Sequence, residues 1–340
     1  MIAAFVLACY ATAIALAAPR AADRWWPGDR LPRLTVALLQ FLACSFLIAT
    51  ITSCLSLAVT LIDLLARVHP AVDACADQLP INDETTVGPI LGDLGLAGAI
   101  VLAARILYCL AATFGTAWLR RRSHSAMLRL CARADPDLGV LVLDHEAAAC
   151  YCMPGRPGTI VVTSATLERL TADQLGAVLS HERAHLRGRH HLLVALAYAV
   201  RRVAPRVRLL TYAERETRRL VELIADDAAS RSHGALTVAA ALAAIGAGHV
   251  PGVALGIGPG DGPPTVARVS RLIAPRRRLE RRAVALSATS VALLLLLPFV
   301  LAALSGYLIA GGCPPSTDNE HPGLSRPPFR VSESIGYYRT

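Results

Sequence analysis

The chain has 340 residues, of which 54% are hydrophobic and only 17% are charged. A soluble domain carries on the order of 25% charged residues, so this composition indicates an integral membrane protein and excludes two ordinary soluble domains. The formal net charge is +9, and all of the cationic residues are arginines. Because these arginines cluster beside apolar runs, where they orient spans, we expect membrane lipid as a partner and no direct binding of nucleic acid.

Three apolar segments in the first third of the chain are long enough to cross a bilayer as helices. They cover residues 2–18, 34–62 and 94–119, and a span needs at least ~17 residues. A signal peptide is the alternative for the first segment, but arginines follow that segment and none precedes it, which favours a retained span. Arg105 lies near the middle of the third segment, where a charge is costly. It is therefore a functional candidate, or else a side chain that extends to the membrane interface or that pairs with Asp63 or Asp93.

A short strand and a capped helix are predicted further along the chain. The β-branched run at residues 159–163 follows a turn rich in proline and glycine, which is typical of a strand, and we expect this strand to pair with an extended substrate. Thr171 and Gln174 predict a capping box that opens a helix. Residues 192–200 are apolar but too short to span a membrane, so we expect them to continue this helix as a core or interfacial segment.

Two histidines on this helix have the spacing of metal ligands. His181 and His185 lie one turn apart on one face, so both imidazoles can reach a single cation. Glu182 lies beside them, where a carboxylate can accept a proton from water during attack on a carbonyl. The alternative without a metal site is a polar helix with two surface histidines. His190 and His191 do not share this face, so we do not expect them to be ligands.

A third ligand is expected on a later helix. Glu222 is the candidate, because a catalytic zinc takes three protein ligands and keeps its fourth position for water. Asp226 lies one turn further along the same face and could hold a ligand histidine through its second ring nitrogen. The sequence therefore predicts a zinc site formed by His181, His185 and Glu222. No residue is assigned to oxyanion stabilisation, for which His233 would be only a guess.

The pattern His-Glu-x-x-His followed by Glu-Leu-x-x-Asp resembles the gluzincin membrane peptidases, and most closely the antirepressor, or β-lactam sensor-transducer, family. The resemblance places the zinc ligands on His181, His185 and Glu222 and the catalytic glutamate on Glu182. It implies a zinc endopeptidase that cleaves a cytoplasmic transcriptional repressor, for which a winged-helix protein is a candidate, in signal-regulated proteolysis. The chain departs from that family in one respect: a large penicillin-binding domain follows the family's last span, whereas a short tail is expected here.

Two alternatives to the repressor-cleaving role remain open. One is a related membrane peptidase that acts in quality control of membrane proteins. The other is a non-proteolytic signalling or scaffold protein whose metal site is vestigial. The presence of both histidines, the base and the two downstream acids together argues against the vestigial site.

The distribution of arginine predicts the topology. A fourth apolar segment covers residues 283–310, with Pro298 as an expected kink, and arginines flank the stretch from residue 120 to 282 at both ends. By the positive-inside rule this stretch lies in the cytoplasm and both termini lie outside the plasma membrane. The expected parts are a three-span region (1–119), a cytoplasmic peptidase domain (120–282), the fourth span (283–310) and a disordered extracytoplasmic tail (311–340).

The predicted fold class is a mainly α-helical membrane protein with four transmembrane helices and an inserted α+β zincin-like domain. Cys150 and Cys152 lack a second pair at zinc-ribbon spacing, so they are predicted to be small core residues. Cys75 and Cys313 would be the only cysteines outside the cell, either bridged or as two free thiols.

Overall fold

The computed structural model describes residues 2–25, 28–76, 87–155, 157–245 and 265–274, with isolated helical positions at 289, 293, 296–298, 300 and 303. The predicted fourth span and tail therefore lie almost wholly outside the described residues. The same holds for Cys313 and for the side chains of Asp63 and Cys75. The described part is mainly α-helical with one small sheet, as the sequence predicts.

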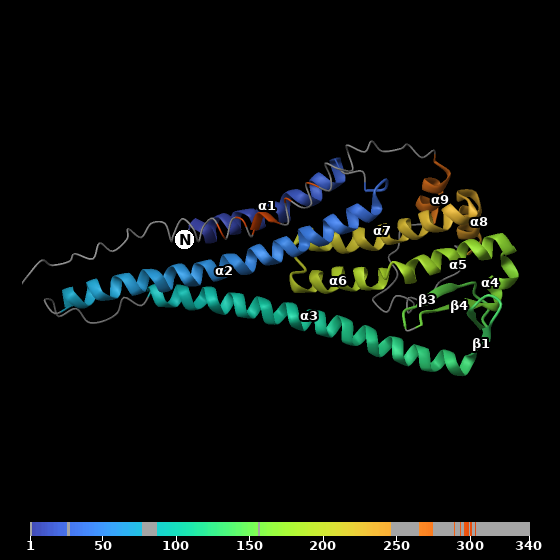
Figure 1. Cartoon of the computed structure of the whole chain (residues 1–340), viewed down its shortest axis with the longest axis horizontal. Helices are drawn as coiled ribbons and strands as arrows, with labels where there is room; N and C mark the ends of the chain where they lie inside the picture. The colour runs from blue at the N-terminus through green and yellow to red at the C-terminus, as the bar shows by residue number, and fades with distance from the viewer. Residues whose placement is uncertain are drawn as a thin grey trace, which may run out of the picture.

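Three long helices extend from one end of the molecule (Figure 1). They are α1 (Ile2–Trp25), α2 (Pro32–Ala76) and α3 (Val87–Cys131), and within the described residues each has a stretch apolar and long enough to cross a membrane. Ser53 on α2 donates to the carbonyl of Ala4, and Tyr10 pairs with Ser45, so α1 and α2 run antiparallel. Large apolar side chains remain exposed on α3, including Val101 and Leu107. This pattern favours contact with lipid.

A glycine sets how closely α2 and α3 approach. A Cβ atom added to Gly95 on α3 would lie 2.9 Å from the carbonyl oxygen of Cys54 on α2. Small residues allow this kind of backbone approach between helices in a membrane. Helix α3 then continues without a break past residue 119 to Cys131, where it leads directly into the sheet.

The sheet has four strands in the order β1-β2-β4-β3. They are β1 (Ala132–Asp135), β2 (Val140–Leu143), β3 (Cys150–Met153) and β4 (Thr159–Thr163). The predicted strand at residues 159–163 is confirmed as β4, with Val161 and Val162 fully buried. However, β4 pairs with β2 on one side and with β3 on the other, so it offers no free edge to a substrate. The expected substrate pairing at β4 is therefore wrong, because β3 occupies that edge.

Six helices complete the described fold. They are α4 (Ser164–Arg169), α5 (Ala172–Arg187), α6 (His190–Val203), α7 (Arg208–His233), α8 (Ala235–Ile245) and α9 (Thr265–Ile273). Helix α5 packs on the sheet through Val178 and Leu179, which share a core with Cys150 and Cys152. The prediction that these two cysteines belong to the core is confirmed. Both are free thiols.

Helix α5 does not continue into residues 192–200, contrary to the sequence prediction. It ends at Gly188, and Arg189 adopts a left-handed conformation with φ 48° before α6 begins at His190. Such a residue cannot extend a right-handed helix, so the chain changes direction. The apolar segment is nevertheless core, because Val194, Ala199 and Val200 are buried.

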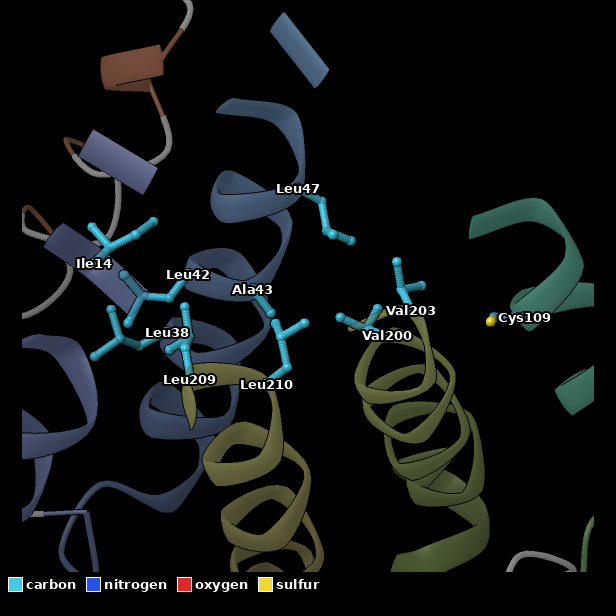
Figure 2. Close-up of a cluster of buried hydrophobic side chains, with 10 residues drawn as sticks. All are labelled: Ile14, Leu38, Leu42, Ala43, Leu47, Cys109, Val200, Val203, Leu209 and Leu210. Atoms are coloured by element: carbon cyan, nitrogen blue, oxygen red, sulfur yellow. The ribbon is translucent and has the colours of Figure 1, made fainter. Parts of the chain in front are cut away.

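The hairpin of α6 and α7 joins the part of the chain that contains the sheet and α5 to the apolar helices. Figure 1 shows the two helices extending between α2 and α3, and Figure 2 shows the apolar cluster at their junction. The cluster combines side chains of five helices, namely Ile14 of α1, Leu38, Leu42, Ala43 and Leu47 of α2, Cys109 of α3, Val200 and Val203 of α6, and Leu209 and Leu210 of α7. The hairpin therefore shares one core with the candidate spans.

Arg105 has a structural partner at this junction. Its Nε donates to the carbonyl of Val203 at 2.6 Å and its Nη2 to the carbonyl of Arg202 at 3.2 Å. These carbonyls belong to the last turn of α6, where a cation satisfies unpaired acceptors and complements the helix dipole. The expectation of an acidic partner at Asp93 is not met, because α6 supplies the acceptors. The structure does not describe the side chain of Asp63.

Candidate metal centre

Helix α5 presents both predicted histidine ligands to the interior. Its first turn is closed by the predicted capping box, in which Thr171 accepts from the backbone of Gln174 and the Gln174 side chain accepts from the backbone of Thr171. The apolar face of α5 rests on the sheet. His181 and His185 are only 8% and 6% exposed, so they are not surface histidines.

Helix α7 brings the predicted carboxylates to the same place. Its apolar residues Leu220, Leu223 and Ile224 pack against the first turns of α2, which fixes the opposite face toward α5. Glu222 Oε2 then lies 3.5 Å from His181 Nε2, and Glu222 Oε1 lies 3.5 Å from His185 Nε2. The structure thus brings together all three residues that the sequence predicts as ligands.

The donor set suits a zinc ion. The Nε2 atoms of His181 and His185 lie 3.0 Å apart, close to the spacing of about 3.3 Å expected for two nitrogens that share a tetrahedral zinc. Two imidazoles and one carboxylate form a usual set of protein ligands at a catalytic zinc, with one position left for water. His181, His185 and Glu222 therefore fit the metal that the sequence predicts.

The charges around the three side chains favour a cation. Burial alone would raise the pKa of Glu222, but His185, His181 and Arg268 outweigh it and hold that pKa well below its usual range. Burial lowers the pKa of His185 to about 3, which keeps its imidazole neutral and able to coordinate. Burial would also lower the pKa of His181, but hydrogen bonds to Asp226 and Glu222 raise it to about 9. A bound metal would have to displace that proton.

Each candidate ligand histidine contacts a second side chain through its Nδ1 atom. Asp226 Oδ1 lies 3.1 Å from His181 Nδ1, the position that the sequence predicts for this aspartate. His190 Nδ1 lies 2.9 Å from His185 Nδ1. The sequence does not predict His190 as a ligand, yet the turn at Arg189 brings its ring against His185. The sequence reasoning missed this contact because it placed His190 on a continuous helix.

Glu182 is partly buried beside the candidate ligands and next to strand β3. Burial raises its pKa to about 7, although His181 and hydrogen bonds from the thiol and backbone N–H of Cys152 favour the charged form. A carboxylate with such a pKa is well placed to take up and release a proton near neutral pH. The neighbouring strand is also the edge of the sheet. This edge, rather than β4, is where an extended peptide could pair beside Glu182.

Arg268 on α9 is a site residue that sequence reasoning missed. Its Nε donates to Asp226 Oδ2 at 2.9 Å, its Nη2 to Asp226 Oδ1 at 2.6 Å, and its Nη1 lies 3.1 Å from Glu222 Oε2. One guanidinium therefore connects a candidate ligand with the carboxylate behind His181. No local pattern marks this arginine among the many in the chain, and it reaches the site only through the packing of α9 on α8 and α7.

His233 takes no part in the grouped site. Its Nε2 lies 2.9 Å from the hydroxyl oxygen of Ser180, and its ring packs closely against Gly176. Ser180 and Gly176 lie on a face of α5 other than the one that carries His181 and His185. His233 therefore contributes to the contact between α5 and α7.

The fold and the site together define a metallopeptidase-like domain attached to apolar helices. The family model of Peptidase family M48 matches residues 115–243, a range that contains His181, Glu182, His185 and Glu222 and ends before Arg268. The match supports a metallopeptidase and does not select the antirepressor family. No curated protein matches the chain, and no solved structure matches it.

Proposed function

We propose that this chain is an integral membrane zinc endopeptidase that hydrolyses a protein substrate on the cytoplasmic side of the plasma membrane. The observation that carries the proposal is the convergence of His181, His185 and Glu222 beside the partly buried Glu182. The similarity of residues 115–243 to Peptidase family M48 supports the same activity. The three candidate spans support the membrane location.

Each residue of the site has a distinct role in the proposed hydrolysis. Zinc, when bound by His181, His185 and Glu222, would polarise the scissile carbonyl and lower the pKa of water toward ~7. Glu182 would accept a proton from the attacking water and return it to the leaving amine, for which its pKa of about 7 is suited. Asp226 and His190 would keep the two imidazoles in position through their Nδ1 atoms. We propose that β3 aligns the substrate backbone beside Glu182.

Two substrates fit this site, and both remain proposals. The first is a cytoplasmic transcriptional repressor, with a winged-helix protein as the candidate, as the resemblance to the antirepressors implies. The second is a membrane protein cleaved in quality control. The packing of the α6–α7 hairpin among the candidate spans favours the second, because it holds the site close to the membrane.

Quantitative proteomics of cells that express the wild type or Glu182→Gln tests the proposal. Glu168→Gln is the matched control, because Glu168 is an exposed glutamate on α4. We expect fragments that are present with the wild type and with Glu168→Gln but absent with Glu182→Gln. Repressor fragments would select the first substrate, and membrane-protein fragments the second. Identical fragment sets in all three strains would refute proteolysis and favour a non-proteolytic role.

A further inference from the structure

A cavity lies next to the candidate metal centre, between α2, α5, α6 and α7. It has a volume of about 570 Å³, within the range of ~300–1,000 Å³ that small ligands occupy in proteins. We call it the arginine cavity, because its polar lining comes mainly from arginines on α2, α5 and α7. These residues are Arg33 at the start of α2, Arg183 and Arg187 on α5, and Arg231 near the end of α7. His190 forms part of the wall that faces the metal centre.

The positive charges of the arginine cavity have no acidic counterpart among its described lining residues. Among the residues that the structure describes as its lining, none is an aspartate or glutamate. Arg183 uses one nitrogen to donate to the carbonyl of Leu138. Within the described part of the chain, Arg33, Arg187 and Arg231 have no carboxylate partner. By contrast, two other arginines of α7 have carboxylate partners on the same helix, since Arg218 pairs with Glu214 and Arg219 with Glu216.

Convergent guanidinium groups without counter-charges repel one another, and a bound anion removes that repulsion. Guanidinium groups bind phosphate oxygens through pairs of parallel hydrogen bonds. The hydroxyl of Ser232 also lines the cavity and could donate a further hydrogen bond. A phosphate group matches this set of donors better than a carboxylate, because its additional oxygens can be reached from three helices at once.

The position of the cavity favours a lipid as the source of the phosphate. Arg33 and Val36 line it from the first turns of α2, at the end of a candidate span. Headgroups of acidic lipids lie at this level of a membrane, and basic pockets beside spans on the cytoplasmic side bind them. We propose that the arginine cavity binds a phosphate-bearing anion, in the first instance the headgroup of an acidic phospholipid.

A ligand here would act on the elements that carry the metal site without contacting the metal. It would connect α5 with α7, which supply the histidines and Glu222, and would lie behind His190, whose ring supports His185. The ligand should therefore stabilise the folded protein. This inference does not depend on peptidase activity.

The test uses the full-length protein in uncharged detergent and follows its thermal unfolding midpoint. Mixed micelles with phosphatidylglycerol, mixed micelles with phosphatidylcholine, and inorganic phosphate are titrated separately. Arg187→Gln with Arg231→Gln removes two charges from the cavity at exposed positions. Arg129→Gln with Arg133→Gln removes two exposed charges elsewhere and is the matched control. Bound zinc is measured in each variant and should not change.

We expect phosphatidylglycerol to raise the midpoint and phosphatidylcholine to leave it unchanged. The apparent affinity for phosphatidylglycerol should fall at least ~10-fold in the cavity variant and stay within about twofold in the control, since only the cavity variant loses charge-assisted hydrogen bonds to the phosphate. An equal response to inorganic phosphate, lost in the same variant, would support the phosphate site and assign a soluble ligand. Equal affinities in the cavity and control variants, or no stabilisation by either ligand, would overturn the proposal. Because cleavage is not the readout, these outcomes are distinguishable from failure of the proposed peptidase activity.

Discussion

Arg268 lies between two carboxylates of α7 and is mostly shielded from water, with 12% of its side chain exposed. Its bidentate pair with Asp226 orients the carboxylate that faces His181, and its contact with Glu222 offsets the charge of a candidate ligand. Burial would lower the pKa of Arg268, but the two carboxylates raise it. The guanidinium therefore remains charged, and we expect it to hold Glu222 and Asp226 in place before the metal arrives.

Glu182→Gln should retain the metal and lose cleavage. The amide fills the same space but cannot accept a proton, so peptide hydrolysis should fall at least ~100-fold. Cleavage of a peptide library by the purified protein, with elemental analysis of the same sample, measures both effects. Activity within a few-fold of the wild type would assign the base to another residue.

His185→Ala and Glu222→Ala should each lose the metal, because each removes one of the three grouped ligands. We expect about one zinc per chain in the wild type. Asp226→Asn should be milder, at about 10–100-fold in metal affinity, since it alters only the support of His181. Elemental analysis after dialysis against a weak chelator decides this, and undiminished zinc in both alanine variants would refute the ligand assignment.

Arg268→Gln should destabilise the domain by about 3–5 kcal/mol, because it leaves Asp226 buried without its cationic partner. Arg271→Gln is the matched control. Arg271 pairs with Asp227 one residue along α7, but both of those side chains are about a fifth exposed, so water can hydrate the remaining carboxylate and the loss should be smaller. Thermal and denaturant unfolding compare the two variants. Equal losses would show that Arg268 has no special role at the site.

At the scale of elements, the sequence predicted those features that depend on residues close together in the chain. The capping box at Thr171 fixed the start of α5, and the spacing of His181 and His185 fixed their shared face, since both follow from helix geometry. The edge position of β3 was not predictable, because strand order depends on which strands meet in space. The break after Gly188 was missed because Arg189 carries no sequence signal for a left-handed conformation.

The conformation of Arg189 can be tested by substitution. Glycine adopts positive φ without steric cost, so Arg189→Gly should leave stability unchanged or raise it by up to about 1 kcal/mol. A β-branched residue is strained there, and Arg189→Val should cost about 1–2 kcal/mol. Denaturant unfolding of the two variants measures the difference. A valine variant as stable as the glycine variant would mean that α5 and α6 are not joined through this turn.

At the scale of the molecule, the sequence could not predict how the domain that carries the candidate metal site packs against the apolar helices. Composition predicted the spans, but the shared core of the α6–α7 hairpin with α2 and α3 arises from residues far apart in the chain. A second contact also joins residues far apart in the chain. Asp29, just before α2, accepts hydrogen bonds from Arg219 and Arg271. The part of the chain between α1 and α2 thus touches the domain that carries the metal site.

A substitution of Arg105 tests how much its hydrogen bonds to α6 stabilise the α6–α7 hairpin against α3. Arg105→Met removes both hydrogen bonds to the last turn of α6 while keeping an unbranched side chain of similar reach. Charge-assisted hydrogen bonds contribute ~1.5–3 kcal/mol each, so amide exchange in α6 should become at least ~10-fold faster. Exchange in α5, which starts from its own capping box, should not change.

Arg105→Lys serves as the partial replacement, because an ammonium group can still donate to one of the two carbonyls. We expect its exchange rates in α6 to fall between those of the wild type and Arg105→Met. Arg129→Gln, at an exposed position further along α3, should match the wild type. If Arg105→Met exchanged like the wild type throughout α6, the apolar cluster alone would hold the hairpin. The hydrogen bonds to α6 would then not explain why the third candidate span carries an arginine. A functional role for Arg105, which its position in the sequence first suggested, would explain it better.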